Sequence, residues 1–359
     1  MKTGLVLGKF MPPHKGHEML ISFAYQFVDK LHIIVDNVND GAFGDNYIPG
    51  EQRVAWLQKK YPYAEVVCLF SPMPQDPNLP GFWQTWKDVI YQTISYRTDY
   101  VFAGELYGFQ LAKNLGSTYI PIGILREIHP ISATEIRNSL KENWDSLASF
   151  VKPDFLLKVA IIGPESSGKT TLTKILSSHY ETTFVPEYAR LYLEPILYER
   201  GINVSKMNFT NDDFLHIIHG QQIFETIQGK NAVRILFSDT DPLLTTLWYR
   251  WIMKTPAPLE IVNLALTSSY DLYLVTKPDI TWTEDCVRYE EMQSERQEFF
   301  NQTINLLEAN NRPYHIISGD YENRVQQAQD IIDQLIQNKF HHSYFSSKWQ
   351  KNITIKRLF

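Results

Sequence analysis

One stretch of the chain, "GPESSGKTT" from Gly163 to Thr171, limits the fold more than any other. It fits the spacing G-x-x-x-x-G-K-[ST], follows the apolar run "KVAII" and precedes the helical pattern "LTKILSSHY". A phosphate-binding loop requires this context of strand, loop and helix. A chance match of all three parts is much rarer than a match of the loop alone. The stretch therefore predicts a P-loop that follows a buried parallel strand.

Short apolar runs alternate with amphipathic helical segments in two series along the chain. In the first series we predict strands at 5–7, 31–35, 65–70 and 100–103, with helices at 17–27 and 52–60. In the second we predict strands at 158–162, 235–238, 272–276 and 315–317. This alternation is typical of the α/β class, in which helices cover both faces of a parallel sheet.

A domain boundary is predicted where the two series meet. A helix is expected from about 133 to 150, and "KPD" follows it just before the second series begins. The predicted domains are therefore 1–152 and 153–359. A chain of 359 residues also exceeds what one hydrophobic core usually serves. The segment 339–359 has five basic residues and no acidic one, which we interpret as a solvated or dimer-contacting tail.

Composition narrows the class of protein. The net charge of -6 argues against a protein that binds long nucleic acids, although small anionic ligands need only local positive groups. Two cysteines, Cys68 and Cys286, provide neither a disulfide framework nor a cysteine-rich metal site. No apolar segment approaches the roughly 20 residues that span a bilayer, and the first residues do not form a signal peptide. We expect a cytoplasmic protein.

The P-loop has a defined chemistry. Its backbone N–H groups and the helix start wrap phosphates, Lys169 reaches the β and γ oxygens of ATP, and Thr170 offers a hydroxyl to Mg²⁺. The predicted ATP-binding residues of this loop are Gly163, Glu165, Ser166, Ser167, Gly168, Lys169, Thr170 and Thr171. The strand "ILFSD" ends in Asp239, which is predicted to contact Mg²⁺ or the attacking hydroxyl. Asp241 is either a second acidic group of the site or the N-cap of the next helix.

Further runs in the second series extend the P-loop signal. "VPEYAR" contains Glu187, Tyr188 and Arg190, and "DITWTEDCVRYEEMQSER" supplies Arg288 and Arg296 to a charged segment suited to close over phosphates. For each arginine alone, a surface salt bridge is an equally good interpretation. Together with "GQQ", "FSDTD", "YDLYLV" and "GDYENRV", these runs closely resemble the ribosylnicotinamide kinase domain of bifunctional NadR-type proteins over nearly all of 156–336.

That resemblance implies a site for nicotinamide riboside in the second domain. The substrate-binding residues it suggests are Glu187, Tyr188, Arg190, Asp241, Trp282, Arg288 and Arg296. One departure stands out, because Asp285-Cys286 stands where Asp-Gly is expected before the lid arginine. The backbone freedom of that turn is therefore reduced.

The first series begins with "GKFMPPHKGH", residues 8–17, directly after a predicted strand. It resembles the G-x-F-x-P-x-H-x-G-H signature of nucleotidylyltransferases, with Gly8, Phe10, His14 and His17 in signature places. Gly8 lets the strand end approach a phosphate, and both imidazoles can point at one triphosphate. Two histidines without a third ligand nearby make a poor zinc site.

A second motif, "ISATEIR" at 131–137, resembles the I-S-[ST]-T-x-x-R segment of the same superfamily. Ser132 and Glu135 alone are explained by a capping box at a helix start. Thr134 and Arg137, one turn apart, are not explained by the cap and can bind a phosphate. The motifs imply that Ser132, Thr134, Lys9 and Arg137 join the histidines around ATP.

The resemblance implies an N-terminal Rossmann-like nucleotidylyltransferase fold and a C-terminal P-loop kinase fold. In the first domain, the phosphate of a mononucleotide would attack the α-phosphorus of ATP, with His14, His17, Lys9 and Arg137 holding charge. The stretch "DPNLPGFWQTWKDVI" is similar to the segment that packs on the nicotinamide ring, with Trp83 and Trp86 on one helix face. Core anchoring by at least one tryptophan is also expected. Ile122-Gly123 replaces an expected aspartate.

We therefore expect a bifunctional enzyme of NAD salvage that phosphorylates nicotinamide riboside to nicotinamide mononucleotide (NMN) and joins NMN to AMP, giving NAD and pyrophosphate. ATP is the co-substrate, Mg²⁺ the cofactor and nucleic acid no partner. The first strand starts within five residues of Met1, so we expect no helix-turn-helix segment before it. Two alternatives remain: related folds acting on other substrates, or a nucleotide sensor linked to a riboside transporter. A homo-oligomer is left open.

Overall fold

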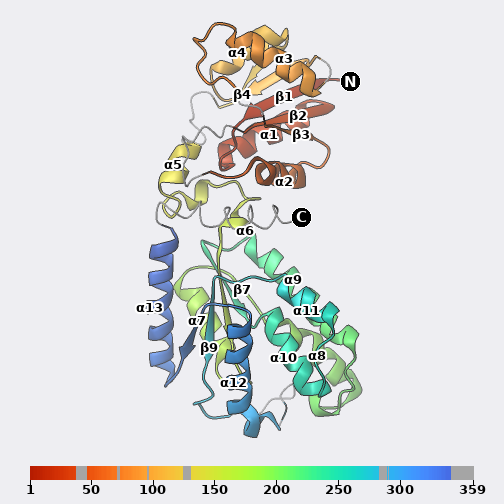
Figure 1. Cartoon of the computed structure of the whole chain (residues 1–359), viewed down its shortest axis with the longest axis vertical. Coiled ribbons are helices and arrows are strands. Elements are labelled where there is room, and N and C mark those ends of the chain that lie inside the picture. Colours follow the sequence, from red (N-terminus) through yellow and green to blue (C-terminus); the bar gives the residue numbers. More distant parts are fainter. Residues whose placement is uncertain are drawn as a thin grey trace. The chain divides into compact units, whose positions relative to one another are not determined.

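The computed structural model describes residues 1–37, 47–70, 73–94, 97–123, 131–282, 289 and 291–340. The chain forms two compact units. Unit 1 comprises Met1–Lys152 together with the last described residues, from Gln337 onward, and unit 2 comprises Pro153–Ile336. Each unit contains a five-stranded sheet with helices around it (Figure 1). The predicted α/β class is confirmed.

The sheet of unit 1 has the strand order β3-β2-β1-β4-β5, and all neighbouring strands are parallel. Its strands are β1 (Thr3–Gly8), β2 (Lys30–Asp36), β3 (Glu65–Leu69), β4 (Tyr100–Ala103) and β5 (Thr118–Pro121). Its first helices are α1 (Lys15–Phe27), α2 (Gly50–Lys60), α3 (Phe82–Ile94) and α4 (Tyr107–Leu115). The four predicted strands are present. The sequence analysis missed β5, a short edge strand whose side chains are only partly buried or exposed.

The helix predicted from 133 to 150 ends early, and this part of the prediction is wrong. Helix α5 covers only Ala133–Asn138, and it is followed by the short 3-10 helix η2 (Trp144–Ser146) and by α6 (Lys152–Phe155). The Asn143 side-chain amide donates to the carbonyls of Glu135 and Ser139 at 3.1 and 2.9 Å, which caps the helix end. Leu147 then forms a β-bridge with His14, and this pairing requires extended backbone.

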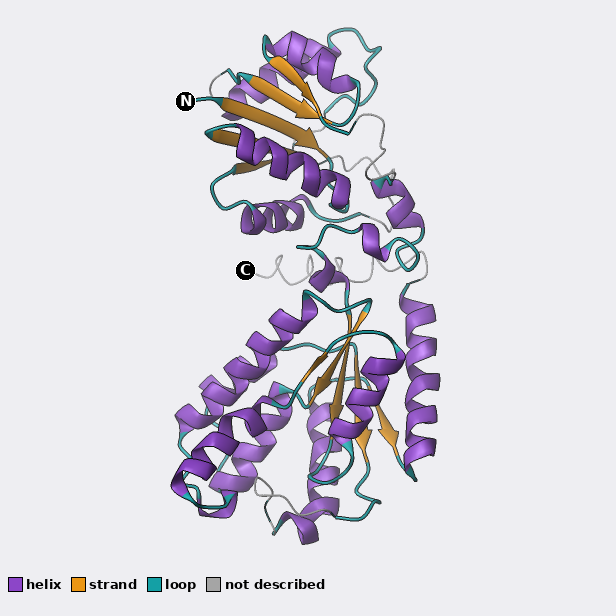
Figure 2. Ribbon diagram, turned by 180° about the vertical axis from the view of Figure 1, so that it is seen from behind, coloured by secondary structure: helices purple, strands orange, loops and turns teal. Residues whose placement is uncertain are grey.

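The sheet of unit 2 has the strand order β10-β9-β6-β8-β7, and all neighbouring strands are parallel. Helices surround both sheets (Figure 2). The strands are β6 (Leu157–Ile162), β7 (Phe184–Val185), β8 (Ile235–Asp239), β9 (Leu272–Thr276) and β10 (Tyr314–Ile317), which confirms the predicted second series. The helices are α7 (Lys169–His179), α8 (Tyr188–Arg200), α9 (Asn211–Gly229), α10 (Pro242–Met253), α11 (Leu259–Leu266), α12 (Met292–Ala309) and α13 (Tyr321–Lys339), with the 3-10 helix η3 (Val204–Lys206).

Both sheets reverse their strand order beside the first strand of the unit. Strand β1 lies between β2 and β4, and β6 lies between β9 and β8. Ligands of open parallel sheets bind outside the carboxyl ends of strands at such switch points. The motif at 8–17 and the P-loop therefore both start at the position the topology favours. Within the described part of the chain, no helix is both long enough and apolar enough to cross a bilayer.

Candidate functional sites

Unit 1 contains a cavity of about 650 Å³ at the carboxyl ends of β1 and β4. Its walls come from the turn after β1, the start of α1, the start of α3 and the start of α5. The sequence-predicted residues among its lining are Gly8, Lys9, Phe10, His14, His17, Trp83, Trp86, Ser132, Thr134 and Arg137. Two motifs more than a hundred residues apart thus meet around one cavity. The turn after β1 is therefore one part of a larger site that also includes the motif at 131–137.

The two histidines lie against each other at the start of α1. Their ring centroids are 3.7 Å apart, and the edge of Phe10 meets His17 with centroids 5.0 Å apart. Burial, reinforced by the neighbouring His14, lowers the pKa of His17 well below its usual range, so its imidazole is neutral at pH 7. The buried Nδ1 of His17 has no hydrogen-bond partner among the described residues. This nitrogen is therefore available to a ligand.

Arg137 ties α5 to the histidine turn. Its guanidinium donates to the carbonyl of Met11, and also to the Thr134 hydroxyl at 2.8 Å. The expected capping box is present, since the Glu135 N–H donates to Ser132 Oγ at 3.2 Å and Glu135 Oε2 accepts from the Ser132 N–H at 2.7 Å. The start of α5 is therefore fixed, with Thr134 and Arg137 facing the same cavity.

The two tryptophans have different roles. Trp86 is 5% exposed, packs in the core and donates through its indole N–H to the carbonyl of Pro74 at 3.1 Å. Trp83 is only partly buried and presents its ring to the cavity wall, where its edge meets Phe82. The expected core anchor is therefore Trp86. An aromatic wall of this kind suits a flat heterocycle.

Asp36 and Tyr107 are among the lining residues of this cavity that sequence reasoning missed. Asp36 is the last residue of β2 and is 5% exposed. Tyr107 begins α4 and donates its hydroxyl to the carbonyl of Leu7 at 2.7 Å. Both lie at the carboxyl edge of the sheet, so the strand assignments alone could have found them. Ile122 and Gly123, which replace the expected aspartate, also line the cavity.

Unit 2 contains a smaller cavity of about 150 Å³ around the P-loop. The predicted residues that line it are Glu165, Ser166, Ser167, Gly168, Lys169, Thr170, Thr171, Glu187 and Arg190. Gly163, the first residue of the motif, does not line the cavity. Its φ is +148°, and a Cβ at this position would lie 2.7 Å from the Thr276 carbonyl oxygen, so only glycine fits here. Lys169 Nζ donates to the carbonyl of Pro164 at 3.0 Å. The loop therefore has the form that the motif predicts.

Thr170, which lines the cavity, contacts Asp239, which is buried and is not among the lining residues. The Thr170 hydroxyl donates to Asp239 Oδ2 at 2.5 Å, while the buried Oδ1 has no hydrogen-bond partner among the described residues. Burial, followed by repulsion from Glu187, raises the pKa of Asp239 to about 7. Lys169 and Arg190 oppose this shift. A hydroxyl beside an unsatisfied carboxylate oxygen is a donor set that fits Mg²⁺.

No cluster of three or more His, Cys, Asp or Glu side chains suited to a metal occurs within the described ranges. A Mg²⁺ ion that arrives with nucleotide phosphates does not need such a cluster, because Mg²⁺ is usually held by one or two protein groups plus phosphates and water. The pair Thr170 and Asp239 is therefore sufficient on the protein side.

Several predicted substrate residues do not line this cavity. The Tyr188 ring packs over α9 so closely that a Cβ at Gly220 would lie 1.9 Å from it. Asp241 is buried and caps α10 by accepting from the Leu244 N–H at 2.8 Å, as the N-cap alternative predicts. Trp282 lies 5.7 Å from the Arg296 guanidinium carbon, outside the lining. Arg288, with Asp285 and Cys286, lies outside the described residues.

Arg296 differs most from its predicted place in a lid. It is 8% exposed on α12, and its guanidinium donates to the carbonyls of Ser166 and Ile280 at 3.0 and 3.1 Å. It therefore holds the P-loop from behind rather than closing over phosphates. A charged residue in a charged segment gave no sign of this burial.

Three further residues of the cavity lining are Gln221, Trp248 and Tyr289. Gln221 on α9 accepts from the Tyr188 N–H at 2.8 Å and donates to the Asp239 carbonyl at 3.3 Å. Trp248 and Tyr289 lie nearly parallel, with an interplanar angle of 24° and centroids 6.2 Å apart. All three line the cavity, and the buried Tyr289 hydroxyl has no hydrogen-bond partner in the described structure. Gln221 lies in the "GQQ" run and Tyr289 in the charged run that begins at Asp279, whereas no quoted run contained Trp248.

The chain is similar to known proteins over most of its length. A family model described as an AAA domain matches residues 158–324. The Escherichia coli "Trifunctional NAD biosynthesis/regulator protein NadR" is 28% identical over 93% of this chain and 83% of its own length. A nicotinamide-nucleotide adenylyltransferase of Thermococcus onnurineus is 29% identical over 42% of this chain and 82% of its own length.

Among solved structures, that of NadR protein in complex with NR has a TM-score of 0.68 and 23% identity. The similarity covers 93% of this chain and 95% of the other. The two chains therefore share their fold over nearly their whole lengths.

Proposed function

We infer that this chain, which is homologous to NadR, is a bifunctional enzyme of NAD salvage. Unit 2 phosphorylates nicotinamide riboside with ATP, and unit 1 transfers an adenylyl group from ATP to NMN, giving NAD and pyrophosphate. One observation carries the proposal: each unit has its own cavity, and the lining of each combines a polyphosphate-binding motif with aromatic side chains. The consumption of ATP favours a cytoplasmic location.

In unit 2 the P-loop binds the phosphates of ATP, and Lys169 contacts the phosphoryl group that is transferred. The rest of the cavity is mainly apolar, formed by Leu193, Phe209, Phe214, Ile217, Trp248, Ile252 and Tyr289. We place the nicotinamide ring of the riboside at Trp248 and Tyr289, because a flat, positively charged pyridinium ring is attracted to aromatic faces. We assign the ribose to Glu187 and Arg190, the charged side chains of the lining outside the P-loop.

Thr170 and Asp239 would hold Mg²⁺, which neutralises charge on the β and γ phosphates when bound. In the alternative role that the sequence allows, Asp239 accepts the proton of the attacking hydroxyl instead of holding Mg²⁺. Gln221 keeps the end of β8 in place through the Asp239 carbonyl.

In unit 1 the attacking phosphate of NMN is already ionised, so no strong general base is needed. Positioning and charge neutralisation do most of the catalysis. His14, His17, Lys9 and Arg137 surround the triphosphate, while Trp83 offers its ring to the nicotinamide. None of these groups acts as a nucleophile. A neutral His17 can donate one hydrogen bond to a phosphate oxygen, and the approach of the anion raises its pKa.

The direct test is to incubate the protein with nicotinamide riboside, ATP and Mg²⁺ and to follow the products by chromatography. NMN should appear first and NAD should follow. Supplying NMN in place of the riboside should give NAD without a lag. No turnover from either substrate would favour a nucleotide sensor, and turnover of a different nucleoside would favour a related kinase fused to another nucleotidylyltransferase.

A further inference from the structure

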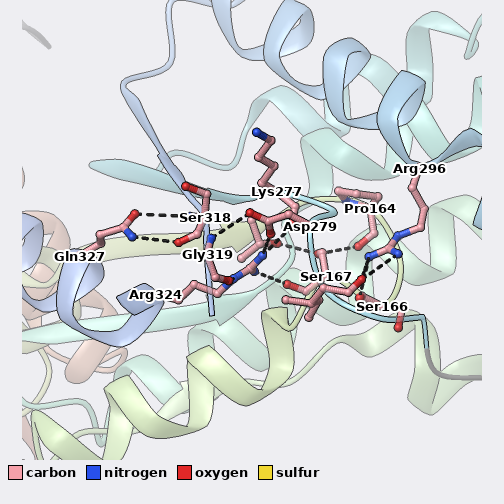
Figure 3. Close-up of polar contacts among 12 residues, drawn as sticks. Pro164, Ser166, Ser167, Lys277, Asp279, Arg296, Ser318, Gly319, Arg324 and Gln327 are labelled. Atoms are coloured by element: carbon pink, nitrogen blue, oxygen red, sulfur yellow. Dashed lines mark hydrogen bonds and ion pairs between the residues drawn. The ribbon is translucent and has the colours of Figure 1, made fainter. Parts of the chain in front are cut away.

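The P-loop of unit 2 is held from behind by two buried arginines that the phosphate chemistry does not use. Arg296 comes from α12 and Arg324 from the first turn of α13, and they are 8% and 4% exposed. Figure 3 shows both guanidinium groups directed at the loop from separate helices. Arg296 donates to the Ser166 carbonyl at 3.0 Å, and Arg324 donates to the Ser167 carbonyl at 2.7 Å.

Arg324 also joins the P-loop to two other loops of the sheet edge. Its remaining N–H groups donate to the carbonyls of Gly319 and Lys277 at 2.7 and 2.8 Å, and to the carboxylate of Asp279. Asp279 in turn accepts from the Gly319 N–H at 2.8 Å. One guanidinium therefore links the loops that follow β6, β9 and β10 (Figure 3).

Peptide geometry gives these contacts a consequence for phosphate binding. In a trans peptide the C=O and the next N–H point in opposite directions. Holding the Ser166 and Ser167 carbonyls outward therefore directs the N–H groups of Ser167 and Gly168 toward the inside of the loop. Those are the groups that a P-loop uses to bind phosphate oxygens. Ser166 is not a glycine but has a positive φ of +52°, a strained conformation that the surrounding contacts must maintain.

We propose that Arg324 and Arg296 are positioning residues that pre-form the phosphate-binding N–H groups of the P-loop before ATP arrives. Arg324 works through geometry rather than net charge, because Asp279 already neutralises it. Lysine cannot replace it, since an ammonium group on one flexible stem cannot bond three carbonyls and a carboxylate in fixed directions. The inference deepens the proposed kinase function and depends on it only for its kinetic test.

The first measurement needs no substrate. Hydrogen–deuterium exchange of peptides covering 163–171 is compared in the nucleotide-free full-length protein and its Arg324→Lys variant. Exchange in this stretch should rise at least about tenfold in the variant, because the loop carbonyls lose their fixed donors. Ile332→Ala is the matched control: Ile332 is fully buried on the same helix, packs against the sheet and does not contact the P-loop.

The second measurement is the rate of riboside phosphorylation. Arg324→Lys should raise the KM for ATP at least about tenfold, with a smaller change in the KM for the riboside. Adenylyl transfer to supplied NMN should be unchanged. Added guanidinium ion should partly restore the ATP affinity of an Arg324→Ala variant, whereas the same concentration of sodium chloride should not.

Arg296→Lys keeps the inference testable if Arg324→Lys does not fold, since it should loosen the same stretch through Ser166 alone. Unchanged exchange at 163–171 in the folded variants would overturn the proposal. Equal changes in Ile332→Ala would do the same, because both arginines would then be ordinary core residues. If the parent protein phosphorylates no riboside, the proposed function fails while the exchange experiment still decides the inference.

Discussion

The two cavities offer different kinds of hydrogen-bond donor to a polyphosphate. In unit 1 the donors around the cavity are side chains, with His14 and His17 from one turn and Arg137 from a distant helix. In unit 2 they are mainly backbone N–H groups of one loop, and the arginines Arg296 and Arg324 lie behind that loop. A side-chain site can lose one donor without a change of backbone. A backbone site depends on whatever fixes the conformation of its loop.

The comparison predicts its largest effect at Lys169, the one flexible charge among the loop donors. Lys169→Ala should lower riboside phosphorylation at least about a hundredfold, since it removes a preorganised charge from the transferred phosphoryl group. NAD formation from supplied NMN should continue at the parental rate, measured in the same preparation by chromatography. Loss of both activities in a protein that stays folded would show that the two sites are not separate.

A smaller effect is expected at His17, because unit 1 shares its charge among several side chains. His17→Ala should reduce NAD formation from NMN roughly ten- to a hundredfold, with the melting temperature within about two degrees of the parent. Riboside phosphorylation is the internal control. His32→Ala is the matched variant: His32 is fully buried in β2, so its loss should lower stability instead. NAD formation at the parental rate would remove His17 from the site.

The smallest effect concerns the pH dependence of folding stability, which we expect to depend on the buried carboxyl of Asp239 in unit 2. The raised pKa of Asp239 means that the folded state binds this proton more tightly than the unfolded state, so stability is lost as pH rises from about 4 toward 7. Without Mg²⁺, Asp239→Asn should therefore raise the melting temperature by a few degrees at pH 8, and by less at pH 5. Phosphorylation should fall in the same variant. A gain independent of pH would contradict this account.

The sequence predicted most of the framework, because strands buried on both faces are continuous apolar runs and both motifs have fixed spacing. The lining of unit 1 followed from those motifs, since each residue type in them has a phosphate-binding reason to be there. The failures have local causes. The helix expected to reach 150 stops at Asn138, because the Asn143 side chain satisfies its last carbonyls.

The prediction was weaker in unit 2. Arg296 and Asp241 are charged residues of the kinds found in catalytic sites, but here their side chains form hydrogen bonds with backbone groups. Composition cannot separate these uses, since the difference lies in which carbonyl or N–H comes near after folding. The same limit applies to Trp248 and Tyr289, which line the cavity. The sequence around an aromatic residue does not indicate whether its ring will face a cavity. Only the folded chain brings the two rings together.

Arg324 lies 157 positions after the serine whose carbonyl it holds, whereas every residue that lines the cavity of unit 1 precedes residue 138. A ribosome delivers these parts in order, and domains generally fold as they emerge. The P-loop is thus synthesised long before the last helix can dock against it. During synthesis, the contact between Arg324 and the P-loop can therefore form only after nearly all of unit 2 has been made.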